Sequence, residues 1–220
     1  GATQFGRTPS PQAMRTHLSL VQYLGFLYID NTTTPSTLKV TKAGRKFLEF
    51  HEDDIETVDN LVVGKKQRKL ILTSPVFKTQ FEKLQLTNPI ELKHCKNILV
   101  FPFRATLRLI KELGYLDQEE IGYFLFNIKR EDEIPLVKLQ IERFREQSKD
   151  KRIKEIETFK KTSYGNIALV QAPTANYFMS LCENTGIIKK CSIEIPNPGA
   201  KPFKKLPAIR IKEGFEEYVT

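Results

Sequence analysis

Two groups of polar side chains have the types that read base edges in duplex DNA, and both stand near the starts of predicted helices. The first group is Arg7, Thr8, Ser10, Gln12, Arg15 and Thr16, and the second is Gln171, Thr174, Asn176, Tyr177 and Ser180. An arginine matches the two acceptors of guanine, and a glutamine or asparagine matches the donor and acceptor of adenine. For any single residue an ordinary surface role fits as well as base contact, so the prediction rests on each group as a whole.

A basic cluster near the end of the sequence has the chemistry of phosphate contact. Its members are Lys189, Lys190, Lys201, Lys204, Lys205, Arg210 and Lys212. Glu194 is the only acidic residue between Lys189 and Lys212, so phosphate contact explains the cluster better than a balanced, solvated surface does. Residues 134–161, by contrast, mix both signs at helical spacing, as an exposed helix does. Within residues 134–161, the side chains that could contact the DNA backbone are Arg143, Arg145 and Arg152.

Catalytic signals in the sequence are weak. Glu91-Leu92-Lys93 is the one acid-x-Lys pattern, and a chain this charged is expected to contain one by chance. His17, His51 and His94 are isolated, and His94-Cys95 has no second pair at the spacing of zinc ligands. Glycine patterns of nucleotide-binding loops are missing from the sequence. We therefore predict no catalytic residue, no metal site and no cofactor in this chain.

The first polar group is placed by a predicted helix and hairpin. Ser10 and Pro11 suit a helix start, and apolar residues recur at helical spacing until Gly25. Residues 26–29 and 37–40 are predicted strands around a turn, and residues 42–50 a closing helix. Helix, hairpin and helix in this order form the back half of a winged helix-turn-helix.

The second polar group stands in a similar order of elements. Residues 105–113 predict a helix that ends at Gly114, and Asp117 caps another helix that runs through Phe126. Residues 134–161 are expected to form one long helix, with a break near Ser148 as the alternative. Pro173 opens a helix that ends at Gly186. Strands at 187–188 and 193–195, and then at 208–211, follow it as a hairpin.

These elements predict a mainly α fold with small β-hairpins (α+β), made of two winged helix-turn-helix subdomains joined by a helical linker. We expect the first subdomain at residues 1–60, truncated at its N-terminal side, and a connecting segment at residues 61–97. The second subdomain is expected at residues 98–220 and includes the long charged helix 134–161.

Composition favours a nucleic acid as the partner. The formal net charge is +9 and the isoelectric point is near 9.4, as expected of a protein that binds a polyanion. No apolar run reaches the length of a bilayer span, which disfavours a membrane. Cys95, Cys182 and Cys191 are few and scattered, as in cytoplasmic proteins. The start at Gly1-Ala2-Thr3 carries no signal peptide and suggests a fragment.

Several stretches, taken in order, resemble AlwI-like type IIS restriction and nicking endonucleases. They are Gln22 to Asp30 with Leu38 to Gly44, Leu109 to Leu116 with Asp117 to Phe124, Ile141 to Glu146, and Ala175 to Phe178 ahead of Gly186-Ile187. The resemblance implies a prokaryotic, cytoplasmic enzyme in which two winged units read a short asymmetric site in double-stranded DNA. It also implies a separate C-terminal Mg²⁺-dependent domain that cuts nearby. That domain is expected to be absent here, as are the two helices that precede the first reading helix.

Three functions fit these observations. The first is a monomeric recognition module of such an endonuclease. The second is a winged-helix transcriptional regulator, which would dimerise and read a palindrome. The third is a small nuclease that uses Glu91 and Lys93. We expect the first.

Overall fold

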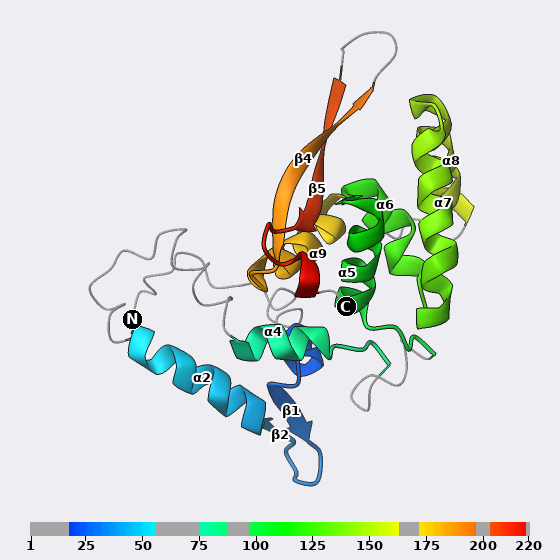
Figure 1. Cartoon of the computed structure of the whole chain (residues 1–220). Coiled ribbons are helices and arrows are strands. Elements are labelled where there is room, and N and C mark those ends of the chain that lie inside the picture. The colour runs from blue at the N-terminus through cyan, green and yellow to red at the C-terminus, as the bar shows by residue number, and fades with distance from the viewer. Residues whose placement is uncertain (1–17, 56–74, 88–96, 163–171, 197–202, 219–220) are drawn as a thin grey trace, which may run out of the picture. The chain divides into compact units, whose positions relative to one another are not determined.

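A computed structural model of the chain describes residues 18–55, 75–87, 97–162, 172–196 and 203–218 (Figure 1). The chain divides into two compact units, residues 1–94 and 95–220. Within the described residues both units are mainly helical, and each has a small antiparallel sheet. This confirms the predicted class, a mostly helical α+β fold.

The first unit contains a hairpin between helical segments. Residues 18–23 are helical, and Gly25, with φ at 71°, ends this segment. Strand β1 (Leu27–Asp30) pairs with β2 (Thr37–Val40) so that Leu27 lies opposite Val40. Helices α2 (Lys42–Ile55) and α4 (Pro75–Glu82) follow. The predicted order of helix, hairpin and helix is therefore present.

Thr41 and Gly44 fix the start of α2 against the hairpin. The Thr41 hydroxyl donates to the Gly25 carbonyl (2.6 Å) and accepts from the Gly44 backbone N–H (3.0 Å), so it caps the helix. A Cβ added at Gly44 would lie 2.2 Å from the Phe26 carbonyl oxygen. Glycine therefore lets α2 approach the hairpin closely enough for Phe26 and Phe47 to stack, with ring centroids 4.7 Å apart.

The second unit begins with a helix, a short strand and a helix. Helix α5 (Pro102–Leu113) buries one face and ends before Gly114, whose φ is 80°. Strand β3 (Leu116–Asp117) leads into α6 (Gln118–Tyr123). The predicted capping box is present, since the Asp117 side chain accepts from the Glu120 N–H (2.8 Å) and the Glu120 carboxylate from the Asp117 N–H (3.0 Å). The helix ends at Tyr123 instead of Phe126, and a 3₁₀ turn, η2 (Leu125–Asn127), follows.

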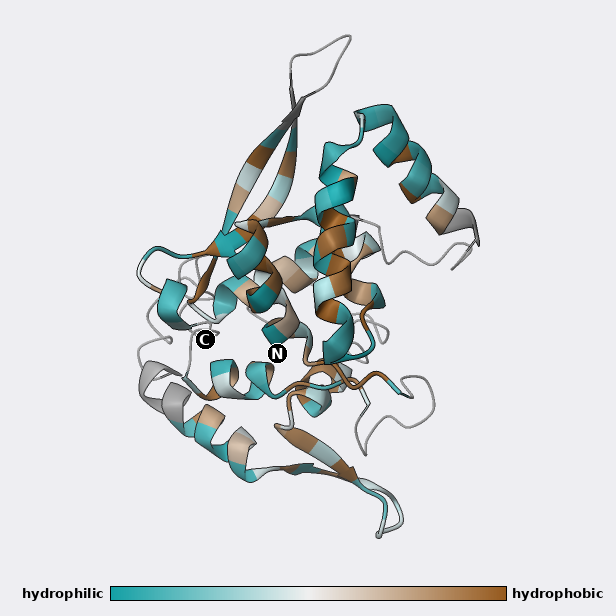
Figure 2. Cartoon of the chain, turned by 45° about the vertical axis from the view of Figure 1, so that its right-hand side comes forward, coloured by the Kyte–Doolittle hydropathy of each residue, from teal (hydrophilic) through white to brown (hydrophobic). Residues whose placement is uncertain are grey.

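The prediction of one long helix over residues 134–161 is wrong. After the 3₁₀ turn η3 (Glu131–Glu133), this stretch forms α7 (Ile134–Glu146) and α8 (Lys149–Thr162), with extended backbone at Gln147 (φ −74°, ψ 152°). The break near Ser148 was the alternative, and it occurs because both helices bury apolar residues: Ile141 and Phe144 in α7, and Ile156 in α8. One straight helix could not place both sets on the same core. The rest of α8 is mainly hydrophilic (Figure 2).

The unit closes with a helix and a long ribbon. Helix α9 (Ala172–Asn184) precedes β4 (Ile188–Pro196) and β5 (Phe203–Ile211), and η4 (Glu216–Tyr218) follows. The sheet has the order β3-β5-β4 and is antiparallel throughout. Both ribbon strands are longer than predicted, because polar residues such as Lys189 and Ser192 also pair through their backbones. Figure 1 shows α9 beside the base of this β4–β5 ribbon.

Candidate nucleic-acid interface

Helix α9 has one buried face and one outward face. Ala175, Met179 and Cys182, which are three or four positions apart, are fully buried, and Phe178 packs edge-on against Phe126 (5.4 Å). The opposite side, which we call the outward face of α9, includes four predicted residues: Thr174 and Tyr177, which are exposed, and Asn176 and Ser180, which are half-buried. Tyr177 is 74% exposed, the highest fraction among the described large hydrophobic side chains. The amphipathic spacing therefore brings together four side chains that the sequence predicted as base-reading.

A hydrogen bond connects the outward face of α9 to the ribbon. Lys190 of β4 donates from Nζ to the Ser180 hydroxyl (2.6 Å), which in turn donates to the Asn176 carbonyl (2.9 Å). Lys190 is exposed, so its ammonium group lies on the solvent side of α9. One member of the predicted basic cluster, Lys190, thus lies beside the predicted polar residues of α9.

The ribbon itself carries an excess of positive charge. Lys189 pairs across the strands with Arg210, which puts two cations side by side on one face. On the other face Lys205 lies opposite Glu194, and the two form an exposed ion pair (3.6 Å). A surface pair of this kind holds its partners weakly. The cations of the ribbon therefore remain available to an external anion.

Other predicted site residues lie where the structure gives no description. Arg7, Thr8, Ser10, Gln12, Arg15, Thr16, Gln171 and Lys201 are outside the described residues, as are Glu91, Lys93, His17 and His94. Lys204 lies in β5, and His51 in α2, with side chains that are also outside them. Of the two groups predicted to read bases, only the second has members in a described helix, and these lie in α9.

Two arginines predicted as backbone contacts instead hold the interior together. Arg145 makes a two-point pair with the Glu120 carboxylate (2.7 and 2.9 Å) and donates to the carbonyls of Leu113 (3.1 Å) and Tyr115 (2.7 Å). Arg152 pairs with Asp117 (3.2 Å). Both carboxylates are fully buried, so these pairs fasten α7 and α8 to α6. The prediction for Arg145 and Arg152 is wrong because their partners are 25 to 35 residues away.

Burial changes the acidity of this charge cluster. Loss of contact with water, followed by the nearby Glu120 carboxylate, raises the pKa of Asp117 to about 7, although Arg152 and the Glu120 N–H oppose the shift. Asp117 is also the cap of α6. The cluster is therefore structural, and its charge state changes near neutral pH.

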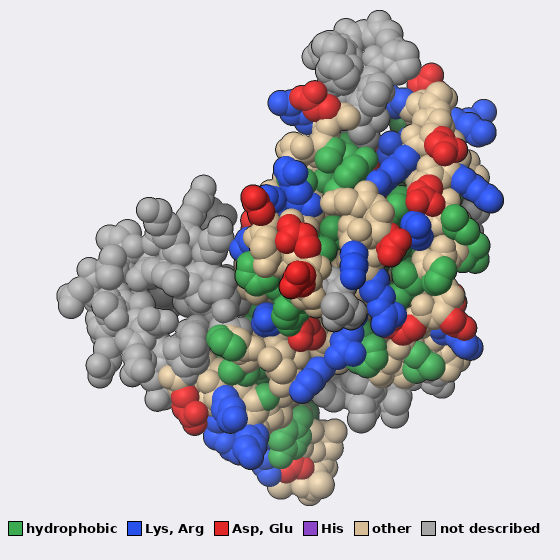
Figure 3. Space-filling view, viewed as in Figure 1, with side chains coloured by type: hydrophobic (Ala, Val, Ile, Leu, Met, Phe, Trp, Pro, Cys, Tyr) green, Lys and Arg blue, Asp and Glu red, His purple; other side chains and the backbone are tan. Residues whose placement is uncertain are grey.

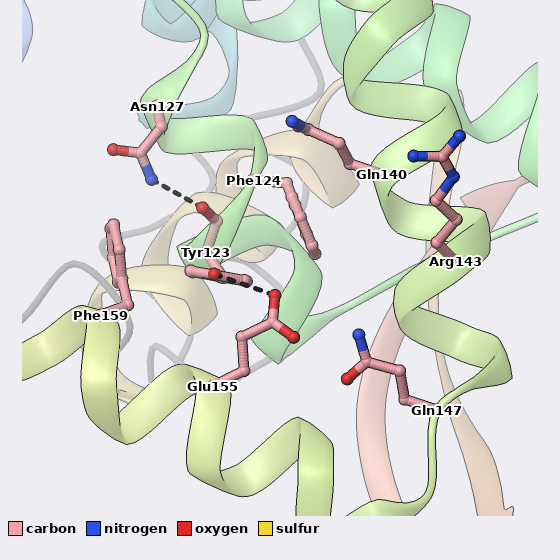
Figure 4. Close-up of a pocket in the computed structure, with 8 residues that line it drawn as sticks. All are labelled: Tyr123, Phe124, Asn127, Gln140, Arg143, Gln147, Glu155 and Phe159. Atoms are coloured by element: carbon pink, nitrogen blue, oxygen red, sulfur yellow. Dashed lines mark hydrogen bonds between the residues drawn. The ribbon is translucent and has the colours of Figure 1, made fainter.

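A groove on the same unit, which we call the α7–α8 groove, was not predicted. It has a volume of about 580 Å³ and is lined by Tyr123, Phe124, Asn127, Gln140, Arg143, Gln147, Glu155 and Phe159 (Figure 4). The Tyr123 hydroxyl donates to Glu155 (3.1 Å), and the pKa of Tyr123 rises to about 12 through burial and that carboxylate. The spacing of Gln140 and Arg143 was a signal that could have revealed a shared helix face, whereas Gln147 follows the end of α7.

Two further properties concern the described residues alone. None of their helices combines the length and apolar character that a bilayer crossing needs. Among the same residues, no cluster of three or more His, Cys, Asp or Glu side chains is arranged to hold a metal ion.

Comparison with known proteins identifies the family. The family model described as AlwI restriction endonuclease matches residues 22–192, which is more than half of the chain. A search of curated proteins gave no match. The matched region includes the Thr41–Gly44 cap, the capping box of α6 and all of α9. The resemblance to AlwI-like type IIS enzymes is confirmed, and the chain belongs to the AlwI restriction endonuclease family.

Proposed function

We propose that this chain is the double-stranded DNA recognition module of a type IIS restriction or nicking endonuclease. A restriction endonuclease acts on DNA, and the family match therefore favours this function over a winged-helix transcriptional regulator. The outward face of α9, hydrogen-bonded to a basic ribbon, is the observation that carries the proposal. In this role α9 enters the major groove, and the ribbon follows the phosphate backbone.

The order of elements supports a winged-helix interpretation of the second unit. Helix α5, strand β3, helix α6, helix α9 and the β4–β5 ribbon follow one another as helix, strand, helix, helix and wing. The strand order β3-β5-β4 places the second wing strand between the other two, as a winged helix requires. Helices α7 and α8 are then an insertion between the two helices of the helix-turn-helix pair.

The first unit is proposed as a second winged unit. Its helical segment at residues 18–23, the β1–β2 hairpin and α2 have the order of a reading helix, a wing and a closing helix. In this proposal the base-reading residues are Gln12, Arg15 and their neighbours. Two such units on one polypeptide suit a monomeric module and an asymmetric site.

Cleavage is assigned to a different part of the enzyme. We propose a separate Mg²⁺-dependent domain, as the family resemblance implies, that cuts at a distance from the bases that are read. Cutting of plasmid DNA by this chain with Mg²⁺, if Glu91→Ala abolished it, would contradict this assignment and support the nuclease alternative.

Selection of bound sequences from a random duplex pool tests the recognition role. We expect one short, non-palindromic site, bound by one copy of the chain. Recovery of a palindrome bound by a dimer would favour the regulator. Recovery of unselected sequences, with affinity that depends only on salt, would remove sequence reading altogether.

A further inference from the structure

The α7–α8 groove is a concave site that the proposed DNA reading leaves without a role. Its volume of about 580 Å³ is that of a small-molecule site. Gln140 and Arg143 line it from one face of α7, since they are three positions apart, and Gln147 lines it from the extended residue that follows the helix. Figure 4 shows Gln147, which follows the end of α7, and Glu155 from α8 extending toward the same space. Two helices thus present polar groups to one opening.

Several of these polar groups lack partners within the described part of the chain. The Gln147 Oε1 acceptor is buried there without a hydrogen bond. The exposed Arg143 guanidinium has neither an ion pair nor a hydrogen bond to another described residue. Glu155 uses Oε1 for Tyr123, which leaves its Oε2 as a second acceptor. A buried acceptor without a donor destabilises the protein, so a ligand that supplies a donor is favoured.

Aromatic rings complete the groove. Tyr123 and Phe159 are half-buried and meet edge-to-face with centroids 4.7 Å apart, and Phe124 packs against Tyr123 at 4.5 Å. Rings that line an open site offer faces on which a flat heterocycle can stack. The Glu155 carboxylate excludes a phosphate from its own end of the groove, whereas Arg143 attracts one.

We infer that the α7–α8 groove binds a nucleotide. The base stacks on the face of one of these two perpendicular rings, with the other ring at its edge, and donates from an exocyclic amino group to Gln147 Oε1 and Glu155. The phosphate pairs with Arg143. Guanine, adenine and cytosine carry such an amino group, and thymine does not, so the groove selects against thymine.

The test is a fluorescence titration with the 5′-monophosphate of 2-aminopurine deoxyriboside, whose emission is quenched when the base stacks. We expect saturable quenching that dGMP reverses at several-fold lower concentration than dTMP does. Arg143→Ala should weaken binding about tenfold because a charge-assisted hydrogen bond is lost. Gln147→Met, which keeps the side-chain volume and removes the acceptor, should weaken binding and remove the preference for dGMP.

Arg130→Ala is the matched control, because Arg130 is an exposed cation of the same unit that pairs with Asp132 outside the groove. It should bind as the unchanged protein does. The inference is overturned if quenching does not saturate, if dGMP and dTMP compete equally, or if both groove variants bind like the control.

The nucleotide could come from a DNA strand or from free solution, and two probes distinguish these sources. A short single strand with one central 2-aminopurine that binds more tightly than the monophosphate would identify a nucleotide displaced from DNA. Equal or weaker binding of the strand would identify a free nucleotide. Neither result depends on duplex reading by α9, so the recognition proposal can fail while the groove proposal stands.

Discussion

The second unit contains two regions rich in basic residues, and they use their charge in opposite ways. In α7 and α8 the long-range arginine pairs point inward, where Arg145 and Arg152 pair with the buried side chains of Glu120 and Asp117. On the described part of the β4–β5 ribbon Lys190, Lys205 and Arg210 are exposed, and the pair of Lys205 with Glu194 is a weak surface pair. Figure 3 shows acidic and basic side chains mixed over the face of α7 and α8 seen in this view. The pairing of a cation, rather than the number of cations in a region, therefore indicates whether it stabilises the fold or binds a partner.

The largest effect is expected where an inward arginine is removed. Arg145→Ala leaves the fully buried Glu120 carboxylate without its partner and should lower the free energy of unfolding by about 3–5 kcal/mol. Chemical denaturation measures this change. Arg130→Ala, which removes a fully exposed pair, should leave the free energy of unfolding nearly unchanged. Equal losses for the two variants would show that Arg145 is not structural.

The next effect concerns pH. The pKa of Asp117 is about 7 in the folded chain and 3.8 is its ordinary value, so the folded state binds the proton more tightly. The stabilisation from Asp117 is therefore complete below its ordinary pKa and is lost as the pH rises through about 7. Asp117→Asn removes this titration and keeps a helix cap.

Between about pH 5 and 7.5 the unchanged protein should lose on the order of 2 kcal/mol relative to Asp117→Asn. Denaturation curves at several pH values give this difference. A difference that stays constant across the range would contradict the assignment of the pKa shift to Asp117.

A smaller and more specific effect is expected on the outward face of α9. Asn176→Ala should relax discrimination at one base pair of the selected site and cost about 1–3 kcal/mol there, while binding of random duplex stays the same. Anisotropy titrations with single-base variants of the site measure this. An equal loss on all duplexes would remove Asn176 from the base-reading residues.

The smallest effect is expected on the ribbon. Lys204→Ala should weaken binding of cognate and random duplex alike and reduce the salt slope by about one. The comparison of affinities at several salt concentrations tests this. A loss confined to the cognate duplex would make Lys204 a base-reading residue. It would then contradict the assignment of base reading to α9 and of phosphate contact to the ribbon.

Residues close together in the sequence correctly predicted the helix caps and helix ends of this structure. Asp117 and Glu120 form a capping box because the two residues are neighbours on one turn. The limits of α9 agree with Pro173 and Gly186 because these residues begin and end a helix in any protein. The ribbon was predicted too short, since backbone pairing tolerates side chains that carry no strand signal.

Long-range contacts explain the failures. The pair of Arg145 and Glu120 spans 25 residues, and no spacing rule connects them. The fold-back of α8 onto Tyr123 likewise depends on a contact between distant rings, Tyr123 and Phe159. The mixed charges on residues 134–161 favoured one exposed helix, although the structure has two helices whose apolar residues pack inward. The α7–α8 groove forms only after that fold-back, so the sequence could not show its lining.

Site-specific photo-crosslinking tests the central claim most directly. A photo-reactive phenylalanine analogue at Tyr177, which is 74% exposed on α9, should crosslink to bases within the selected site. The same analogue at Leu136, which is 58% exposed on α7, is the matched control and should give no base crosslink. Crosslinks from position 136 but not from position 177 would contradict DNA reading by α9.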